Sequence, residues 1–395
     1  MNNSHNSRRP LAARRLAGVV AAAAAVSIAL VSTANAATHA APGTRPHPAD
    51  TSLRALAEPT GLRIGVSINP DRLSDPAYAA IAGGQFSTVT PENQMKWDNI
   101  EPTQGTYHWA PAEKVVAFAD AHGQKVRGHT LLWANQIPSW LTDDVGNGSI
   151  TDAQLRTIVK KHVIDEVSHF RGKIWQWDVA NEMFANSWDA NPLPDGINGD
   201  EFWVQHLGEG IIADAFRWAH AADPHALLFY NDYNISGEDG TNAKADAVYA
   251  WAKKMRAEGV PIDGIGEQGH LDTQYGFSGD LERSDLQRYA GLGLKVAITE
   301  ADVRTFVDSA ATQVPTDSLA ASAQSNEFSQ ELQACLEVRS CISFTVWDVD
   351  DADSWVPGTF AGEGAATLYD VNLKPKAQYT ALQQTLQLAA GAPRR

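Results

Sequence analysis

Short runs rich in valine, isoleucine and aromatic residues alternate with longer amphipathic segments from residue 63 onward. This alternation predicts βα units, in which each strand of a parallel sheet is followed by a helix that packs on it. The expected strands are 63–69, 86–92, 125–133, 174–182, 226–234, 264–272, 295–303 and 341–349. The expected helices include 110–122, 152–169, 202–221, 243–258, 280–290 and 319–338.

Eight such units over one stretch of chain predict an α/β fold with a single closed (β/α)8 barrel, a TIM barrel, which we place at residues 57–390. Barrels of this kind usually take about 250 residues and grow by insertion into their loops. A doubly wound open sheet is the competing architecture. It often carries a G-x-G-x-x-G phosphate loop after its first strand, and this chain has none there. Residues 391–395 are expected to form a short tail.

The N-terminal 36 residues are typical of an export signal. Basic residues reach Arg15, an apolar run covers 19–31, and the small-residue pattern Ala-Asn-Ala stands at 34–36. A membrane anchor is the alternative, but this run is short for a hydrocarbon layer of about 30 Å. We therefore expect a secreted, extracellular protein.

The export route stays open, because residues 7–11 (SRRPL) resemble a twin-arginine motif that any basic leader can imitate. After the signal, residues 37–56 are rich in alanine, proline, histidine and threonine and have no apolar period. This composition predicts a flexible leader before the folded domain.

Charge narrows the range of partners. The chain has 31 Lys and Arg against 47 Asp and Glu, and removal of the four arginines of the signal leaves a formal charge of −20. Such a surface repels nucleic acid and anionic membranes, so we expect neither as a partner. No stretch after the signal has 18 consecutive apolar residues. We therefore expect either a neutral partner or an active face that is locally uncharged, and the expected state is a monomer.

Cysteine usage favours a structural role over a metal site. Cys335 and Cys341 are the only cysteines, and two cysteines six residues apart in an exported protein favour a disulfide. Neither has a histidine or acidic cluster beside it at the spacing of metal ligands. We expect no metal and no cofactor.

The expected strands share polar or aromatic residues at their carboxyl ends. In a barrel these ends meet on one face, where enzymes of this fold place their chemistry. Burying a carboxylate there without a partner costs several kcal/mol, so the pattern needs a reason. The residues are Glu92, Asn93, His129, Trp133, Asn181, Glu182, 231–234, Gln268, His270, Glu300, Asp302, Trp347 and Asp350.

Glu182 and Glu300 close the fourth and seventh expected strands. Two carboxyl groups facing one another are what glycoside hydrolysis requires, since one must donate a proton while the other stays ionised. A salt bridge to a nearby lysine or arginine is the alternative for either one alone.

Tryptophans support the carbohydrate interpretation, because indole rings stack on the apolar faces of sugars. Trp97, Trp133, Trp347 and Trp355 lie at or just after strand ends. Core packing remains the usual explanation for a single tryptophan.

Residues 62–386 resemble the catalytic domain of glycoside hydrolase family 10, the endo-1,4-β-xylanases. Seven motifs carry the resemblance, in the family's order along the chain. They are TPENQMK (90–96), GHTLLW (128–133), WDVANE (177–182), NDYN (231–234), GIGEQGHL (264–271), ITEADV (298–303), and Trp347 with DADSW (351–355).

The resemblance implies a retaining double displacement with Glu182 as general acid/base and Glu300 as nucleophile. Their carboxyl groups are then expected about 5–5.5 Å apart. Asn181 would bond the 2-hydroxyl of the sugar under attack. His270 would hold Glu300 in place, and Asp302 would orient the imidazole of His270.

The resemblance also implies a set of substrate-binding residues and a polysaccharide substrate, xylan. Trp133 would form the floor of the cleft, Tyr233 would line the aglycone side, and Gln268 would also contact the sugar. The glycone side would be lined by Glu92, Asn93, Lys96, His129, Gln136, Trp347 and Trp355.

Two other functions stay open. Xylose lacks only the exocyclic CH2OH of glucose, so a cellulase or broader β-1,4-glycanase is possible on the same residues. A non-catalytic carbohydrate-binding relative is the other alternative, although such a protein would be expected to lose one of its two glutamates.

Three positions depart from the family pattern. Ala134 stands where a histidine is common, Asp348 where a glycine is usual, and Ala301 where a larger aliphatic residue is common. These differences bear on substrate affinity and pH optimum. Cys335 and Cys341 match a short disulfide that many members have before the last strand.

Overall fold

The computed structural model describes residues 50–237 and 242–391. The expected export signal, residues 37–49 of the expected leader and residues 392–395 lie outside the described residues. Within the described ranges, no helix has both the length and the apolar character needed to cross a membrane.

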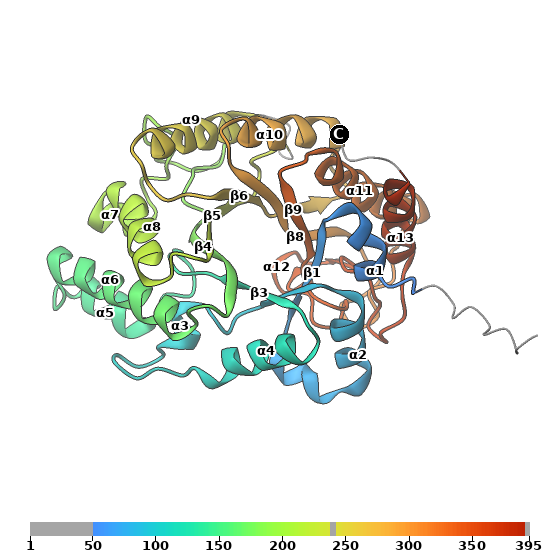
Figure 1. Cartoon of the computed structure of the whole chain (residues 1–395), viewed down its shortest axis with the longest axis horizontal. Helices are drawn as coiled ribbons and strands as arrows, with labels where there is room; N and C mark the ends of the chain where they lie inside the picture. Colours follow the sequence, from blue (N-terminus) through green and yellow to red (C-terminus); the bar gives the residue numbers. More distant parts are fainter. Residues whose placement is uncertain (1–49, 238–241, 392–395) are drawn as a thin grey trace, which may run out of the picture. The chain divides into compact units, whose positions relative to one another are not determined.

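Eight parallel strands close into a ring (Figure 1). The ring closes because β1 pairs with β2 on one side and with β9 on the other, where Arg63 is opposite Ser343. An open sheet would leave its two outer strands unpaired, so this closure confirms the predicted (β/α)8 barrel. In order around the ring, the strands are β1 (Arg63–Ile68), β2 (Thr88–Pro91), β3 (Lys125–His129), β4 (Ile174–Asn181), β5 (Leu227–Asp232), β6 (Gly264–Glu267), β8 (Lys295–Phe306) and β9 (Cys341–Val346).

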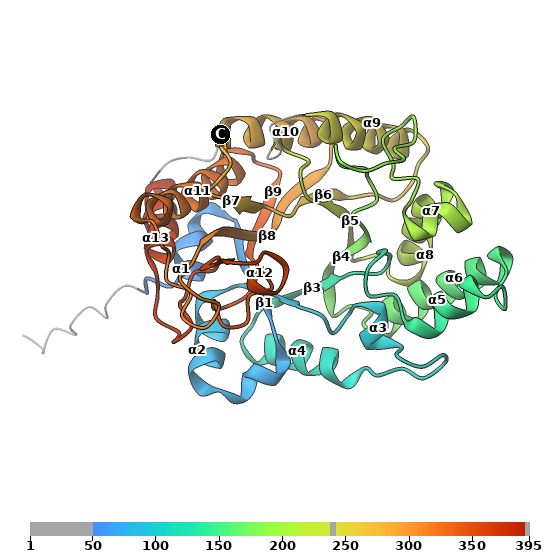
Figure 2. The ribbon, with the colours of Figure 1, turned by 180° about the vertical axis from the view of Figure 1, so that it is seen from behind.

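Helices surround the ring of strands, and the short helix α12 (Val356–Thr359) lies in front of the ring when it is seen from behind (Figure 2). Two short strands extend the sheet, β7 (His270–Asp272) and β10 (Glu363–Gly364), and both pair with β8. The remaining helices are α1 (Leu53–Ala57), α2 (Pro76–Gln85), α3 (Trp97–Ile100), α4 (Ala110–Ala121), α5 (Ser139–Gly146), α6 (Asp152–His169), α7 (Phe202–Leu207), α8 (Gly210–Ala222), α9 (Ala243–Ala257), α10 (Gly279–Gly291), α11 (Ser318–Glu337) and α13 (Ala377–Ala390).

Local sequence explains where individual helices start. Helix α6 begins at a capping box, in which Gln154 N donates to Thr151 Oγ1 at 3.4 Å and Thr151 N donates to Gln154 Oε1 at 2.9 Å. These two bonds satisfy amide groups that the first turn leaves without a partner. The apolar side chains of the helix, such as Leu155 and Val159, are fully buried.

Two expected elements are interrupted at glycines. The helix expected at 202–221 is wrong as one element, because Gly208 has φ 72° and separates α7 from α8. The strand expected at 264–272 is likewise two strands, β6 and β7, with Gly269 at φ 79° between them. A positive φ is compatible with neither helix nor strand and favours glycine.

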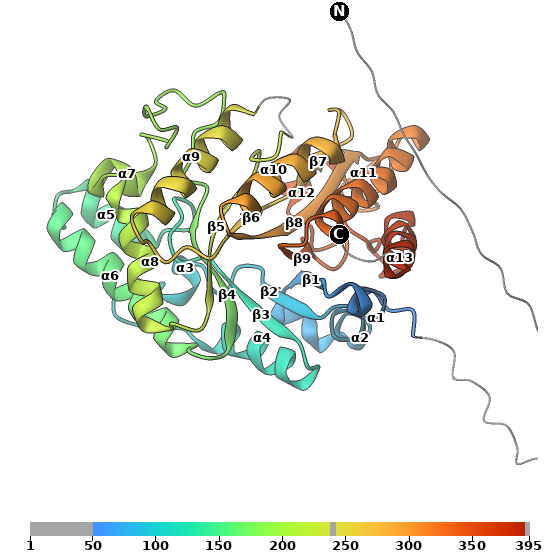
Figure 3. The same cartoon turned by 45° about the horizontal axis from the view of Figure 1, so that its top comes forward.

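The expected leader is wrong at its C-terminal end. Residues 53–56 belong to helix α1, whose Ser52 cap accepts a hydrogen bond from Ala55 N at 3.3 Å and whose Leu53 is fully buried. Helix α1 packs beside α13, which also packs on α11 (Figure 3). The Cys335–Cys341 disulfide is confirmed and joins the end of α11 to the first residue of β9.

Candidate active site

One cavity of about 670 Å³ opens at the carboxyl ends of the strands. It brings together side chains from segments that are far apart in the sequence, and all the predicted substrate-binding residues line it. The lining is Glu92, Asn93, Lys96, His129, Trp133, Asn135, Gln136, Glu182, Trp188, Tyr233, Asn234, Gln268, His270, Glu300, Arg304, Trp347, Trp355 and Phe360. Asn181 and Asp302 do not line the cavity but bond to residues that do.

Glu300, on β8, is almost completely buried, with 4% of its surface exposed. Its Oε1 atom accepts hydrogen bonds from Asn231 Nδ2 at 2.8 Å and from Arg127 Nη2 at 3.2 Å. His129 Nδ1 lies 3.8 Å from the same oxygen. Glu300 therefore faces cationic or potentially cationic groups through one of its oxygens.

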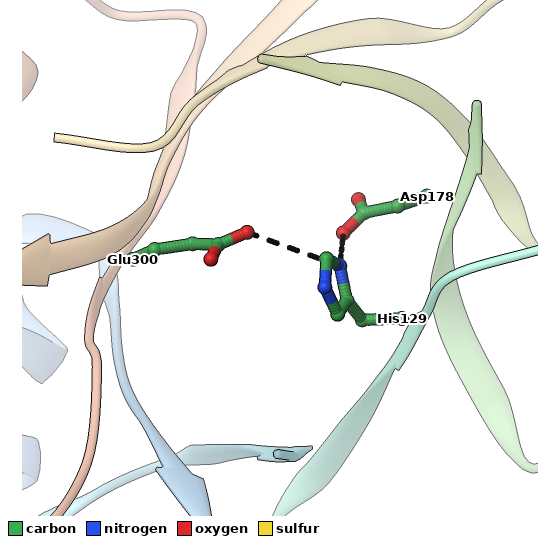
Figure 4. Close-up of side chains that lie close together, drawn as sticks. All are labelled: His129, Asp178 and Glu300. Carbon is green, nitrogen blue, oxygen red and sulfur yellow. Dashed lines mark hydrogen bonds and ion pairs between the residues drawn. The ribbon is translucent and has the colours of Figure 1, made fainter. Parts of the chain in front are cut away.

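His129, Asp178 and Glu300 point toward one another inside the ring of strands (Figure 4). His129 Nδ1 lies 2.9 Å from Asp178 Oδ2, and Arg127 Nη2 bonds to both Asp178 and Glu300. Donor atoms of these three residues lie within 4.8 Å of one another, a spacing that could hold a metal ion. The guanidinium of Arg127 already supplies positive charge to both carboxylates, so the donor set fits a buried ion-pair cluster.

The electrostatic surroundings keep Glu300 ionised. Burial by itself raises the pKa of this carboxyl group. The nearby charges of His129, His270 and Arg127, with the hydrogen bond from His270, outweigh burial and hold the pKa of Glu300 well below its usual range. Glu300 is therefore a carboxylate at any ordinary working pH.

His270 lies between two carboxylates. Its Nε2 atom is 3.5 Å from Glu300 Oε2, and its Nδ1 atom is 2.9 Å from Asp302 Oδ2. Burial lowers the pKa of His270, but Asp302 and Glu300 more than compensate and raise it to about 10. Asp302 is itself held by Trp355, whose Nε1 donates to Oδ2 at 2.7 Å. The imidazolium is thus fixed in orientation and donates toward Glu300.

Glu182, directly after β4, has a different environment. Its backbone is in the left-handed region with φ 57°, an uncommon conformation for a residue other than glycine. Trp133 Nε1 donates to its Oε2 at 2.8 Å, and Gln268 Nε2 donates to its Oε1 at 2.9 Å. Among the described residues, no lysine, arginine or histidine forms an ion pair with Glu182.

Two amides connect the glutamates. Asn231 Nδ2 donates to Glu300 Oε1 at 2.8 Å and to Asn181 Oδ1 at 2.7 Å. Asn181 Nδ2 in turn donates to Glu182 Oε1 at 3.0 Å. This chain of neutral hydrogen bonds fixes the positions of the two carboxyl groups relative to each other without neutralising either.

Glu92, Asn93 and Lys96 form a polar group elsewhere in the same cavity. Asn93 Nδ2 donates to Glu92 Oε1 at 2.8 Å, and Lys96 Nζ donates to Asn93 Oδ1 at 2.9 Å. Lys96 Nζ also lies 4.9 Å from the centre of the Trp133 ring. Burial lowers the pKa of Lys96 and raises the pKa of Glu92. These groups offer both donors and acceptors to a ligand with many hydroxyls.

The expectation for Trp97 is wrong. It is 4% exposed, stacks on His162 with ring centres 3.7 Å apart, and packs against Trp203 in the core. Core packing explains this tryptophan, whereas Trp133, Trp347 and Trp355 line the cavity as predicted.

Sequence reasoning missed Arg304, which lines the cavity, and the buried ion pair of Arg127 and Asp178. Arg127 stands two residues before His129 on β3, so both side chains point to the same face of the strand. Asp178 interrupts an apolar stretch of β4, and both residues are buried. The available signals were the position of Arg127 two residues before His129 on one strand and the charge of Asp178 between two apolar neighbours.

The structure explains why glycine is usual at position 348 in the family pattern. Asp348 has φ 72°, a conformation that favours glycine, and its carboxyl group is buried next to Ser67. Ser67 Oγ donates to Asp348 Oδ1 at 3.1 Å, while Oδ2 has no hydrogen-bond partner among the described residues. Burial, with the negative charge of Glu92, raises the pKa of Asp348 well above its usual range.

Comparison with known proteins agrees with this geometry. The family model described as glycosyl hydrolase family 10 matches residues 52–385. The chain is 38% identical to endo-1,4-beta-xylanase B of Thermotoga neapolitana over 86% of this chain and 92% of that protein. It is also 38% identical to endo-1,4-beta-xylanase C of Phanerodontia chrysosporium, over 84% of this chain and 78% of that protein.

Solved structures show the same similarity. Native xylanase 10B of Thermotoga maritima superposes with a TM-score of 0.77 at 38% identity, covering 86% of this chain and 99% of that one. Xylanase 10B of Thermotoga petrophila, solved with xylobiose, gives a TM-score of 0.78 at 36% identity, covering 87% and 99%. With a closed barrel, Glu182 directly after its fourth strand, Glu300 on its seventh strand and a family match over nearly the whole described region, this chain belongs to glycosyl hydrolase family 10.

Proposed function

We propose that the chain is an endo-1,4-β-xylanase that hydrolyses internal β-1,4-xylosidic bonds of xylan with retention of configuration. The observation that carries the proposal is the unequal environment of two linked glutamates in one cavity. Glu300 contacts cationic groups, whereas Glu182 contacts neutral donors. Two carboxyl groups with such different surroundings are suited to different roles in one reaction. The substrate class is supported by the relatives, which are endo-1,4-beta-xylanases.

In the first step, a carboxylate oxygen of Glu300 attacks the anomeric carbon while Glu182 donates its proton to the departing glycosidic oxygen. The bond to the leaving chain breaks and a glycosyl ester of Glu300 forms. In the second step, Glu182 removes a proton from water, the water oxygen attacks the anomeric carbon, and Glu300 leaves as a carboxylate. The two inversions give net retention, for which the carboxyl groups are expected to be about 5–5.5 Å apart.

The neighbouring residues act through these two groups. The His270 imidazolium, oriented by Asp302, keeps Glu300 ionised and aimed at the sugar. Asn181 is placed beside Glu182 to bond the 2-hydroxyl of the sugar, an interaction that strengthens as positive charge develops on the ring. No step of this mechanism requires a metal ion or an organic cofactor.

The proposal includes the location of the enzyme and its state in solution. We propose export through the signal at residues 1–36 and action outside the cell as a monomer. The N-terminal sequence of protein recovered from culture medium tests the first point, with a start near Ala37 expected. Size-exclusion chromatography with light scattering tests the second, with the mass of one chain expected.

The central experiment measures reducing-sugar release from xylan and from carboxymethylcellulose by the wild type, Glu182→Ala and Glu300→Ala. We expect the wild type to release reducing sugar from xylan. We expect Glu300→Ala to lose this activity when no external nucleophile is added. Comparable wild-type rates on both polymers would instead indicate a broader β-1,4-glycanase. A wild type that cleaves neither polymer would indicate a carbohydrate-binding protein.

A further inference from the structure

A tyrosine side chain of the neighbouring strand holds the backbone directly after Glu182. Met183 N donates to Tyr230 Oη at 3.0 Å, and Tyr230 belongs to β5. The amide before it, Glu182 N, donates to Asn231 O at 3.0 Å. Between these two bonds lies the left-handed backbone of Glu182, with φ 57°. Such a conformation in a residue other than glycine persists only where its surroundings hold it, and the Tyr230 hydroxyl is part of those surroundings.

Tyr230 is itself fixed in position and in hydrogen-bond direction. It is fully buried, and its ring centre lies 5.0 Å from that of Trp251 and 5.6 Å from that of Phe184. Its hydroxyl donates to Asp232 Oδ2. Burial, with the negative charge of Asp232, raises the pKa of Tyr230 well above its usual range, so the hydroxyl keeps its proton. That proton points to Asp232, which leaves a lone pair to accept from Met183 N.

Asp232 forms a buried ion pair with Lys244, the second residue of α9. Asp232 is fully buried and Lys244 is 4% exposed. Lys244 Nζ donates to Asp232 Oδ1 at 2.7 Å. Burial raises the pKa of Asp232 to about 6, although Lys244 opposes the rise, so Asp232 is a carboxylate in neutral solution. Tyr230, Asp232 and Lys244 thus form one connected group, the Tyr230 network.

Stability alone is a weak explanation for this ion pair. Loss of hydration opposes the attraction between two buried charges, so such a pair often adds little net stability. Among the described residues that line the cavity, none belongs to the Tyr230 network. The network instead reaches the site through the backbone of Met183, whereas Trp133 and Gln268 hold the carboxyl group of Glu182.

We propose that the Tyr230 network positions the acid/base Glu182. The ion pair orients the Tyr230 hydroxyl, and this hydroxyl fixes the peptide group that follows Glu182. The inference rests on the proposed function, because it takes Glu182 to be the acid/base. Its consequence is that damage to the network impairs proton transfer to the leaving group and leaves the attack by Glu300 intact.

The test compares two aryl β-xylobiosides that differ in their need for an acid. Phenolate leaves well only when it is protonated, whereas 2,4-dinitrophenolate leaves without a proton. The quantity measured is kcat/KM for each substrate, which includes the first chemical step. Because a small misplacement of a catalytic group is costly, Tyr230→Phe should lower kcat/KM about tenfold for the phenyl xylobioside and less than about twofold for the dinitrophenyl xylobioside.

Tyr78→Phe is the matched control. Tyr78 is also buried, with 1% exposure, and its hydroxyl likewise accepts from a backbone amide at 3.0 Å, that of Asn69. Tyr78 lies on α2 and is not one of the described residues that line the cavity. Its loss of a hydroxyl should leave the ratio of the two kcat/KM values unchanged.

A second readout separates positioning from a general loss of folded protein. With the dinitrophenyl xylobioside, kcat and KM should fall together in Tyr230→Phe. Water activation by Glu182 is then slowed, so the glycosyl ester of Glu300 accumulates. A smaller folded fraction would lower kcat and leave KM unchanged.

The double variant Asp232→Asn with Lys244→Met tests the other end of the network. It removes both charges, so no unpaired charge stays buried, and it should give the same pattern as Tyr230→Phe. A wild type that cleaves neither xylobioside would overturn the proposed function and this inference together. A wild type that cleaves both, with kcat/KM lowered equally for the two substrates or for neither in both variants, would overturn the positioning role alone.

Discussion

The Nε2 atom of His270 lies 3.5 Å from Oε2 of Glu300. The opposite nitrogen of the same ring lies 2.9 Å from Asp302 Oδ2, so the imidazole links a carboxylate of the cavity to one beneath it. This arrangement keeps a proton on His270 and removes one from Glu300, since each charge stabilises the other. Together with the charges of His129 and Arg127, His270 therefore keeps the proposed nucleophile ionised.

The His270 interaction predicts a pH-dependent stability. The pKa of His270 is raised to about 10 in the folded protein, against about 6.5 for an unperturbed histidine. Its contribution to stability is fully present below pH ~6.5 and is lost as the pH rises toward ~10. In thermal melts, the advantage of the wild type over His270→Gln should therefore shrink between pH 6.5 and pH 10. An advantage that stays constant over this window would contradict the assignment.

The different roles of the two glutamates predict opposite stereochemistry in chemical rescue. With azide and an aryl β-xylobioside, Glu300→Ala should give an α-glycosyl azide, because azide attacks the substrate directly from the free face. Glu182→Ala still forms the glycosyl ester, so azide should give the β-glycosyl azide. Nuclear magnetic resonance of the products distinguishes the two. Both variants giving the same anomer would show that the roles are assigned wrongly.

Arg127→Met should destabilise the fold by about 3–5 kcal/mol, because it leaves Asp178 and Glu300 buried without their shared cation. Denaturant unfolding measures this loss. Arg217→Met is the matched control, since Arg217 pairs with Asp214 at the surface and should contribute less than about 1 kcal/mol. Equal losses of unfolding free energy in the two variants would mean that the buried cluster stabilises the fold no more than a surface ion pair does.

Asp348→Gly should stabilise the protein at neutral pH by about 1 kcal/mol, because glycine tolerates the positive φ and the variant removes a buried carboxyl group. The folded pKa of Asp348 is raised, so its carboxyl group opposes folding increasingly as the pH rises above ~3.9. The gain in melting temperature should thus be larger at pH 7 than at pH 4. Asp348→Asn separates the two causes, since it removes the charge but keeps the side chain at positive φ.

Much of this protein could be predicted from local patterns. Strand residues such as Val66 and Val89 alternate with helical segments at a spacing that only repeated βα units produce, and the residues at the ends of these strands converge once the ring closes. For that reason the cavity contains all the predicted substrate-binding residues. Breaks such as Gly208 and Gly269 were harder to predict, because a glycine in a helical or extended pattern has no fixed conformation.

Contacts between distant strands decided the rest. The amino-acid sequence by itself determined the barrel, its polar face and the two glutamates, since these depend on periodicity and on position along each strand. It did not determine that Trp97 packs in the core on His162, or that Arg127 bonds to Glu300 across 173 positions of chain. The charge state, burial and stacking of a side chain depend on which other side chains contact it. Only the closed tertiary structure determines those contacts.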